Sequence, residues 1–321
     1  MSARVVVIAG GLSPERDVSL RSGRRVAEDL REAGIEAQVR DIDATLIPSL
    51  IEDPPSCALP LVHGVAGEDG SLQEVLQSIG LPFVGSSAHA CRRSFDKATA
   101  GALLADAGIS VPDSIALPQT MFRDLGAPVL LAVITERLGL PLVIKPNRGG
   151  SALGVSIVHD AGGLPAAMVG AFAYGEVVLI QRYVQGTEIA VAVTDSGDSH
   201  TAPRAMPCVE IVPDSGLYDY AARYTAGTTE FFTPARLPAE TLAAAAQTAV
   251  HAHEVLGLRD WSRSDLMVDD AGTAWFLEAN VAPGMTETSL FPQAIAASHT
   301  TASVLLAALV HRATNRAENW G

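Results

Sequence analysis

The first hundred residues alternate between short apolar runs and longer stretches in which apolar positions recur with helical spacing. The apolar run at residues 5–9 predicts a buried strand. We expect the next helix to have Ser13 as its N-cap and Pro14 in its first position, and to end at Gly34. This alternation predicts a small domain built on a parallel sheet. Further strands are expected at residues 39–42 and 58–62, and further helices at residues 71–79 and 90–108.

The middle of the chain contains a glycine-rich loop between two predicted strands. A strand at residues 142–145 leads into the glycines of residues 149–154, and a strand at residues 155–158 follows. In a P-loop the glycines open a helix and precede Lys-Ser/Thr, so this loop is of a different kind. The dinucleotide fingerprint Gly-x-Gly-x-x-Gly is also missing after the first strand. Further strands are expected at residues 177–180 and 189–193, and helices at residues 239–256 and 301–312.

These elements predict an α/β and α+β protein with three domains and a functional site between them. Hydrophobic residues make up 48% of the 321 residues, charged residues 18%, and the mean hydropathy is +0.24, which allows a large core and excludes global disorder. No apolar run approaches the roughly 20 residues that a membrane span needs, and the N-terminus has too short an apolar stretch for a secretory signal. We therefore expect a cytoplasmic protein.

The chain is acidic, with 22 Lys and Arg against 36 Asp and Glu and a net charge of −14. Such a surface repels nucleic-acid backbones and anionic lipid, so neither is expected as a main partner. An anionic substrate would have to be held by a few local cations or backbone N–H groups. The cysteines Cys57, Cys91 and Cys208 are widely spaced and match neither a disulfide framework nor a zinc pattern, so we expect small, inert hydrophobic residues.

Lysine is rare in this chain. Lys97 and Lys145 are the only lysines, against 20 arginines. Lysine binds phosphate as a point charge on a flexible stem, whereas arginine offers a planar fork. The two lysines are therefore either surface residues retained by chance or phosphate ligands, and their rarity alone leaves both interpretations open.

Residues 263–280 are expected to form a β-hairpin around a four-residue turn. We expect Val268 to pair with Thr273, which would place Asp265 opposite Phe276. Strand alternation then gives the hairpin one polar and one apolar face. The polar face would carry Arg263 (opposite Glu278), Asp265, Glu278 and Asn280, and the apolar face Leu266, Val268, Trp275 and Leu277.

Two carboxylates and an amide beside an arginine suit Mg²⁺ and leave a cation to meet negative charge. A solvated hairpin face would show the same pattern. The polar groups lie away from the turn and next to residues 281–289, where Pro283 and Gly284 can form a turn that exposes backbone N–H groups toward a developing oxyanion. This position favours a functional site.

Two more segments are candidates for the site. Residues 63–70 combine His63 and two acidic residues with three glycines after a strand, where α/β proteins bind ligands, although a single histidine is more often structural. Residues 218–224 hold three of the five tyrosines. They indicate either an amphipathic core element or a mobile flap over a site.

Taken in order, these motifs resemble those of the D-alanine–D-alanine ligases, members of the ATP-grasp superfamily. The resemblance covers nearly the whole chain. It implies an ATP-grasp fold with an N-terminal α/β substrate domain at residues 1–96, a central ATP-grasp domain at residues 97–182 and a C-terminal ATP-grasp and catalytic domain at residues 183–321. The matching residues are Gly10, Gly11, Ser13, Glu15, Val18, Ser19, residues 63–70, Asp96, Lys97, Lys145, Pro146, Gly150, Ser151, residues 218–224, Arg263, Asp265, Glu278, Asn280, Pro283 and Gly284.

The resemblance also implies roles for individual residues, with ATP and two Mg²⁺ ions as cofactors (Mn²⁺ as a substitute), D-alanine as the substrate and a homodimer as the assembly. The ATP-binding residues would be Lys97, Lys145, Gly150, Ser151, Gln181, Tyr183, Val184, Glu188 and Arg223, and the metal ligands Asp265, Glu278 and Asn280. Glu15 and His63 would hold the first D-alanine, Ser289 and Leu290 the second, and Arg263 with the Gly284 N–H would stabilise the carbonyl oxygen. Glu15, Ser151 and Tyr224 would form a hydrogen-bonded triad over the substrates, under a flap at residues 218–232.

The implied reaction has two steps. The carboxylate of the first D-alanine attacks the γ-phosphate of ATP and forms an acyl phosphate, whose carbonyl carbon is then attacked by the amino group of the second D-alanine. Three residues depart from the family pattern: Gln181 replaces glutamate, Arg223 replaces lysine and Val281 replaces threonine. Tyr224, where some members have histidine, favours an amine over a hydroxy acid as acceptor.

The leading interpretation is a D-alanine–D-alanine ligase that supplies the dipeptide for peptidoglycan. A second interpretation keeps the ATP-grasp chemistry but joins or cyclises a different small amino acid, which the changes at Arg223 and Val281 leave open. A non-catalytic nucleotide-binding regulator would lack the metal ligands, and all three are present.

Overall fold

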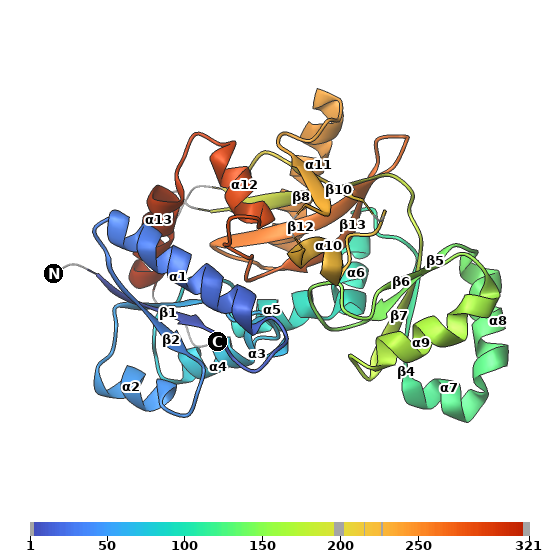
Figure 1. Cartoon of the computed structure of the whole chain (residues 1–321), viewed down its shortest axis with the longest axis horizontal. Helices are drawn as coiled ribbons and strands as arrows, with labels where there is room; N and C mark the ends of the chain where they lie inside the picture. The colour runs from blue at the N-terminus through green and yellow to red at the C-terminus, as the bar shows by residue number, and fades with distance from the viewer. Residues whose placement is uncertain (1–2, 196–201, 215, 226, 317–321) are drawn as a thin grey trace.

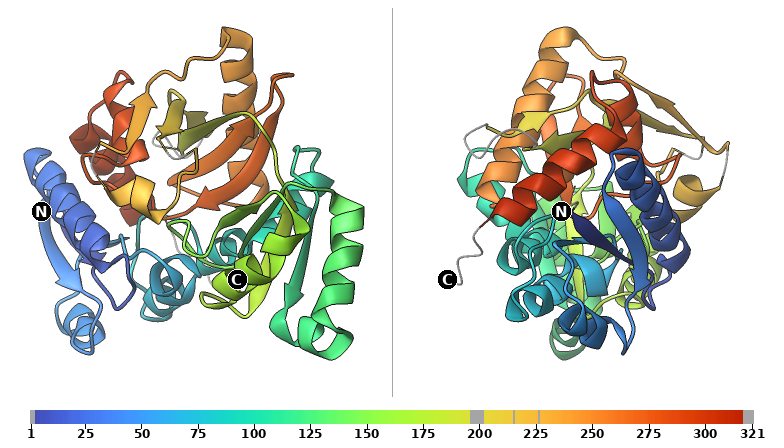
Figure 2. Two further views of the ribbon diagram at one scale, coloured as in Figure 1. Left: turned by 45° about the vertical axis from the view of Figure 1, so that its right-hand side comes forward. Right: turned by 90° about the vertical axis from the view of Figure 1, so that its left-hand side faces the viewer.

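The computed structural model describes residues 3–195, 202–214, 216–225 and 227–316, apart from the side chains of Ala221 and Tyr224. In this part of the chain the strands form three β-sheets, each with helices packed against it (Figures 1 and 2). The mixture of one parallel and two antiparallel sheets confirms the predicted α/β and α+β fold. None of the described helices is both long and apolar enough to span a bilayer.

The N-terminal sheet is parallel, as the sequence predicts. Strand β1 (Arg4–Ala9) lies between β2 (Glu36–Asp41) and β3 (Cys57–Pro60). All of β1 from Val5 onward is buried, which explains its continuous apolar run. Helix α1 (Arg16–Glu32) packs on this sheet (Figure 1). The shorter helices of this region are α2 (Leu46–Glu52), α3 (Val65–Glu68) and α4 (Ser71–Ser78).

The predicted start of α1 was wrong. The helix begins at Arg16, with Glu15 in the N-cap position, and Ser13 lies in the turn before it. The Ser13 hydroxyl donates to the carbonyl oxygen of His63 at 3.1 Å and accepts from the Glu15 N–H at 3.2 Å. Ser13 therefore joins this turn to the loop after β3, a contact between distant segments that local capping rules do not include.

The single helix predicted at residues 90–108 is two helices, α5 (Ala88–Phe95) and α6 (Lys97–Asp106). Asp96 between them has an extended backbone, and its carboxylate accepts from the Thr99 N–H at 3.0 Å as the N-cap of α6. The Lys97 N–H donates to the carbonyl oxygen of Asn147 at 3.1 Å. This break places Lys97 next to the glycine-rich loop.

Helix α1 approaches β1 closely at Gly23. A Cβ atom at this position would lie 2.6 Å from the Ala9 Cβ. We expect Gly23→Ala to lower the free energy of unfolding by about 1–3 kcal/mol, because the helix would have to move away from the sheet. Gly170, in a helix where an added Cβ meets nothing within 4 Å, is the matched control. There alanine should raise stability by about 0.5–1 kcal/mol. Thermal and urea unfolding of both variants checks the two signs, and a stable Gly23→Ala variant would contradict this packing argument.

The central sheet is antiparallel, with the strand order β4-β7-β5-β6. Its strands are β4 (Ser114–Pro118), β5 (Leu142–Pro146), β6 (Ser156–Val158) and β7 (Val177–Arg182), and its helices are α7 (Gln119–Leu125), α8 (Ala127–Leu138) and α9 (Leu164–Phe172). The glycine-rich loop connects β5 to β6, which confirms the predicted strand–loop–strand arrangement. Figure 1 shows this sheet and its helices at the end of the molecule opposite to β1 and β2.

The third sheet is the largest, and its main path is β11-β10-β8-β12-β13. One face packs on α11 (Ala239–Val255), and the other packs on α12 (Leu290–Ala296) in a core that continues to α13 (Ala302–Asn315) and to the N-terminal sheet. The helices predicted at residues 239–256 and 301–312 are thereby confirmed. The strands are β8 (Thr187–Thr194), β9 (Arg204–Ala205), β10 (Val209–Pro213), β11 (Thr229–Phe232), β12 (Trp261–Val268) and β13 (Ala274–Asn280), and the short helix α10 (Tyr220–Tyr224) precedes β11.

The predicted hairpin is present as β12 and β13, but its predicted register was wrong. Val268 pairs with Ala274 rather than Thr273, and Asp265 lies opposite Glu278 rather than Phe276. The turn has five residues, 269–273, instead of four, which accounts for the pairing of Val268, and a β-bulge at Leu277, which has no partner on β12, shifts the pairing of Asp265 by one more residue. The predicted polar face is nevertheless correct. The apolar face is formed by Leu266, Val268, Ala274 and Phe276, while Trp275 is half-buried outside this core and Leu277 lines a cavity.

Candidate active site

Two adjoining cavities, of about 850 and 900 Å³, are lined by residues from all three sheet regions. Every residue predicted for the site lines one of them, with the exception of Tyr224, whose side chain lies outside the described part of the structure. The first cavity contains Glu15, His63, Ser151, Arg263, Asn280, Gly284, Ser289 and Leu290, and the second contains Lys145, Gln181, Tyr183, Val184, Glu188 and Asp265. The two share Lys97, Gly149, Gly150, Tyr218, Arg223 and Glu278.

The second cavity has mainly apolar walls and a charged end. Lys145, on β5, is buried, and this burial lowers the pKa of its ammonium to about 8. Glu188 lies at the start of β8, and burial raises the pKa of its carboxyl to about 7. Gln181, at the end of β7, is buried as well. The apolar walls are formed by Val143, Leu153, Val155, Ile157, Met267 and Leu277.

The β12–β13 hairpin places a carboxylate–cation network where the two cavities meet. The Arg263 guanidinium donates two hydrogen bonds to Asp265, from Nε to Oδ1 at 2.6 Å and from Nη2 to Oδ2 at 2.8 Å. Directly opposite Asp265, Glu278 lies 3.2 Å from the Lys97 ammonium. Burial alone would raise the pKa of Glu278, but the neighbouring cations, Lys97 above all, lower it to about 2. The Glu278 carboxylate is therefore ionised at neutral pH in the free protein.

This donor set fits a divalent cation. Asp265 and Glu278 are a cross-strand pair, and the Asn280 amide follows two residues later on the same face. Two carboxylates and an amide oxygen are ligands that Mg²⁺ accepts, and substrate phosphates commonly complete its coordination. In the described ranges, no cluster of three or more His, Cys, Asp or Glu side chains is suited to a metal. The hairpin donor set accordingly has only two charged ligands, and its third ligand is an amide. Lys97 and Arg263 compensate these charges in the free protein.

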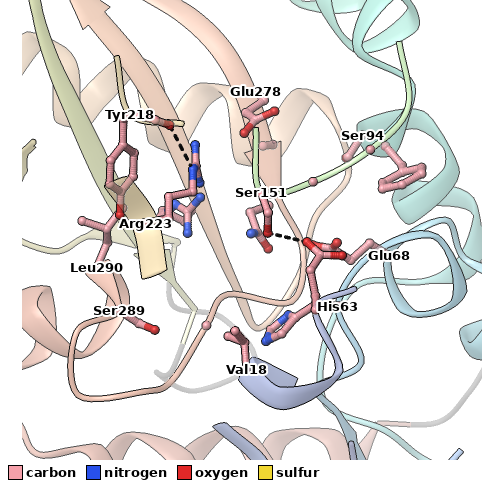
Figure 3. A pocket seen from close by; sticks show the side chains of 18 of the residues that line it. Val18, His63, Glu68, Ser94, Ser151, Tyr218, Arg223, Glu278, Ser289 and Leu290 are labelled. Carbon is pink, nitrogen blue, oxygen red and sulfur yellow. Dashed lines mark hydrogen bonds between the residues drawn. The ribbon is translucent and has the colours of Figure 1, made fainter. Parts of the chain in front are cut away.

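Glu15 in the first cavity is held by the glycine-rich loop. It is buried at the start of α1, and the Ser151 hydroxyl donates to its Oε1 at 2.5 Å (Figure 3). Ser151 has a φ of +51°, and a Cβ on the preceding Gly150 would lie 2.9 Å from the same oxygen. The loop thus needs glycine at position 150 to approach Glu15 so closely.

His63 lines the same cavity as Glu15 (Figure 3 shows His63). Burial lowers the pKa of its imidazole to about 4, so the ring is neutral at physiological pH. Its Nε2 is buried and has no hydrogen-bond partner among the described residues. A buried polar atom without a partner beside a cavity is suited to contact a polar ligand.

The loop between β13 and α12 closes the far side of the first cavity. A Cβ on Gly284 would lie 2.8 Å from the Ser289 hydroxyl oxygen, so the backbone passes very close to this side chain. The Ser289 hydroxyl accepts from the Thr286 N–H at 3.1 Å and lies 2.8 Å from the Thr286 hydroxyl. Thr286 and Thr288 also line the cavity, which the sequence alone did not predict.

The tyrosine-rich segment is both a core element and a cover. Tyr218 is buried, its ring packs edge-on against Phe231, and it lines both cavities. The Arg223 guanidinium lies 4.4 Å from the centre of the Tyr218 ring, and its Nε donates to the Tyr218 carbonyl oxygen at 3.2 Å (Figure 3). Arg223 is held at the junction of the cavities by this segment.

The family model for the D-ala D-ala ligase C-terminus matches residues 103–311. A D-alanine–D-alanine ligase of Anaeromyxobacter dehalogenans strain 2CP-1 is 40% identical over 290 residues, which is 90% of either chain. One of Desulforudis audaxviator is 37% identical over 320 residues, covering 98% of this chain and all of the relative. The chain belongs to the D-alanine–D-alanine ligase family.

Solved structures agree with this assignment to the D-alanine–D-alanine ligase family. The D-alanine–D-alanine ligase of Bacillus anthracis superposes with a TM-score of 0.82 at 30% identity, over 97% of both chains, and its complex with ATP with a TM-score of 0.80. VanG D-Ala:D-Ser ligase from Enterococcus faecalis has a TM-score of 0.83 at 27% identity, over 97% of this chain and 99% of the other. The ATP-grasp fold that the resemblance implied is thereby confirmed.

Glu68 is the acidic residue of this site that the sequence analysis did not assign. It is buried at the end of α3, its Oε2 accepts from the Gly64 N–H at 2.7 Å, and it lines the first cavity (Figure 3). Burial, with a smaller contribution from the nearby Glu15, raises the pKa of its carboxyl to about 8. The glycine-rich motif at residues 63–70 drew attention to this loop, but only the fold brings Glu68 close to Glu15.

We expect Glu68→Gln to change how stability depends on pH. The folded-state pKa of Glu68 lies above its ordinary value of 4.5, so its favourable contribution is complete below pH 4.5 and is lost as the pH rises through about 8. Relative to Glu68→Gln, the parent protein should lose up to about 1.4 kcal/mol per pH unit between pH 5 and pH 8. Urea unfolding of both proteins at several pH values measures this difference, and a constant difference would contradict the assigned pKa.

Proposed function

We propose that the protein joins two D-alanine molecules to D-alanyl-D-alanine with the conversion of ATP to ADP and phosphate, supplying a peptidoglycan precursor. The observation that carries this proposal is the junction of the two cavities at Lys97 and Glu278. An apolar cavity with a cationic end suits a nucleotide, and a cavity with a buried carboxylate and several hydroxyls suits amino acids. The names of the relatives and the ATP complex of the Bacillus anthracis enzyme support the same reaction.

On the nucleotide side, Gln181 would lie near the adenine amino group, and Tyr183, Val184 and Glu188 would also contact the nucleotide. Lys97, Lys145 and Arg223 would bind the phosphates, together with the loop around Gly150. Asp265, Glu278 and Asn280 would hold two Mg²⁺ ions, with Mn²⁺ as a substitute. The ions would supply charge neutralisation of the phosphates during transfer.

The first D-alanine would bind in the first cavity with its ammonium against Glu15. Glu15 is fixed by Ser151, and the neutral His63 offers a polar contact without adding positive charge. The carboxylate of the first D-alanine would then point to the junction of the cavities, where one of its oxygens attacks the γ-phosphorus of ATP. The bond between γ-phosphorus and the bridging oxygen breaks, ADP leaves and an acyl phosphate forms.

The second D-alanine would bind between Ser289 and Leu290 and attack the acyl carbon with its neutral amine. The carbonyl oxygen becomes negative in this step, and the Arg263 guanidinium and Gly284 N–H are placed to stabilise it. Phosphate then leaves with the electron pair of the carbon–oxygen bond. Tyr218 and Arg223 above the junction would exclude water, which otherwise hydrolyses the acyl phosphate.

Product analysis by mass spectrometry, with ADP measured in parallel, tests this function. The protein, ATP, Mg²⁺ and D-alanine should give D-alanyl-D-alanine and ADP in equal amounts. The same assay with D-serine as second substrate, the acceptor named for the VanG relative, is the comparison. ADP release without dipeptide would favour the alternative of another small amino acid, and no ADP release would overturn the proposal.

We further propose a homodimer that acts in the cytoplasm, where ATP is available. Sedimentation analysis tests the assembly.

A further inference from the structure

The loop that carries Gly284 and Ser289 is anchored at Met285. The Met285 side chain is completely buried in the core shared by the N-terminal and the largest sheets. Its backbone N–H donates to the Ser22 hydroxyl at 3.0 Å, and Ser22 is also completely buried. This bond joins the loop to α1 across 263 residues of sequence.

Ser22 shares one face of α1 with the residues that line the first cavity. Glu15 stands at the N-cap, and Val18 and Ser22 follow at intervals of three and four residues (Figure 3 shows Val18 facing the cavity). Glu15 and Ser22 are therefore about 10 Å apart along the helix axis. Because Gly23 packs tightly on Ala9, α1 is a rigid support for both.

We infer that Ser22 is a positioning residue, which holds the loop at residues 283–289 at a fixed place relative to Glu15 through its bond to the Met285 N–H. The inference rests on the proposed function. Glu15 would hold the first amino acid, and the Gly284 N–H and Ser289 act on its carbonyl oxygen and on the second amino acid. Ser22 thus fixes the distance between the group that holds the first amino acid and the groups that act on the second, without touching a substrate.

Loss of the Ser22 hydroxyl leaves the Met285 N–H buried without an acceptor. A buried donor without a partner is costly, so the loop is expected to shift toward a new acceptor or water. Such a shift moves Gly284, which immediately precedes Met285, and leaves Glu15 and the nucleotide cavity in place. The acyl phosphate would still form, but its capture by the second amine would be slower than its hydrolysis.

Ser19 provides a matched control on the same helix. It too is completely buried, and its hydroxyl accepts from the Gly10 N–H at 2.8 Å and donates to the Leu61 carbonyl oxygen at 2.7 Å. Ser19→Ala therefore loses two buried hydrogen bonds, against one for Ser22→Ala. Both of its bonds are to segments that follow β1 and β3, and neither reaches the loop at residues 283–289.

The test measures the KM for each D-alanine and the ratio of ADP to dipeptide in the parent protein, Ser22→Ala and Ser19→Ala, with thermal midpoints alongside. For Ser22→Ala we expect the KM for the second D-alanine to rise on the order of tenfold, which corresponds to the free energy of one hydrogen bond. The KM for ATP should be unchanged. Its ratio of ADP to dipeptide should exceed one. Ser19→Ala should keep a ratio of one even where its thermal midpoint is lower. Ser22→Cys, which retains a weak acceptor, should fall between the parent and Ser22→Ala, and it gives the same readout if Ser22→Ala does not fold.

A parent-like ratio and second KM in Ser22→Ala, or the same change in Ser19→Ala, would overturn the positioning role. A parent protein that makes no dipeptide would instead overturn the proposed function. The two failures are therefore distinguishable in one set of assays.

Discussion

Replacement of Asp265 by asparagine is expected to lower kcat on the order of 10³-fold or more, and to lower stability as well, because the buried Arg263 guanidinium loses its charged partner. The Asp265 carboxylate accepts both hydrogen bonds of Arg263 and is one of only two carboxylates of the hairpin at the junction. Asparagine keeps the shape and one acceptor but removes the negative charge. The variant would hold Mg²⁺ weakly and leave Arg263 free to turn from the carbonyl oxygen that it should stabilise.

Asp269→Asn is the matched control for this prediction. Asp269 follows β12 at the opposite end of the hairpin, where it accepts from the Thr273 N–H at 2.9 Å and from the Trp275 indole at 2.8 Å, and it lines neither cavity. Its replacement should alter thermal stability and leave kcat near the parent value. ADP release and calorimetric titration with Mg²⁺ and ATP would measure both variants. An Asp265→Asn variant with parent-like kcat would refute the metal-ligand assignment.

Lys145→Met is expected to raise the KM for ATP at least on the order of 100-fold, because a charged contact to phosphate is lost. The thermal midpoint should stay within a few degrees of the parent's. Methionine has a similar length and needs no solvation, whereas burial makes the Lys145 ammonium costly and lowers its pKa to about 8. The ammonium is charged below that pH, so kcat/KM for ATP should fall in the parent as the pH rises through about 8. Lys145→Met should lack this decline.

Nucleotide binding measured by fluorescence titration separates this effect from a change in the chemical step. A Lys145→Met variant that binds ATP as tightly as the parent would remove Lys145 from the nucleotide site. A variant that unfolds at a much lower temperature would show instead that the ammonium stabilises the fold.

The sequence predicts this site well where motifs are local and less well where contacts are long-range. Residues that are close together in the sequence were enough to recognise the two lysines, the hairpin face and the glycine-rich loop. The roles of Glu68 and Ser22 could not, because each depends on a partner that only the fold brings near. Pairing of Ser13 with His63 likewise overrides the capping preference that predicted the start of α1.

The hairpin shows why a correct face can follow from a wrong register. Alternation assigns faces along one strand and needs no knowledge of the partner, so Arg263 and Asp265 were placed together correctly. The bulge at Leu277 shifts the pairing of β13 by one residue, and no residue type in that strand indicates a bulge. Domain boundaries and the roles of the individual site residues stay predictions.

The bulge also determines which kinds of mutation the hairpin tolerates. Phe276 points into the core and Glu278 toward the cavities, although strand alternation would put residues two apart on the same face. Leu277 is therefore an extra residue in the ladder, and neither face of the hairpin depends on its side chain. Apolar replacements of Leu277 should leave the carboxylate in place, and deletion of Leu277 should do so too, because Glu278 would then follow Phe276 directly and regular alternation would keep it on the cavity side. In a mutational scan of β13, deletion of Leu277 should be tolerated better than deletion of Trp275, which would place the core residues Ala274 and Phe276 on opposite faces.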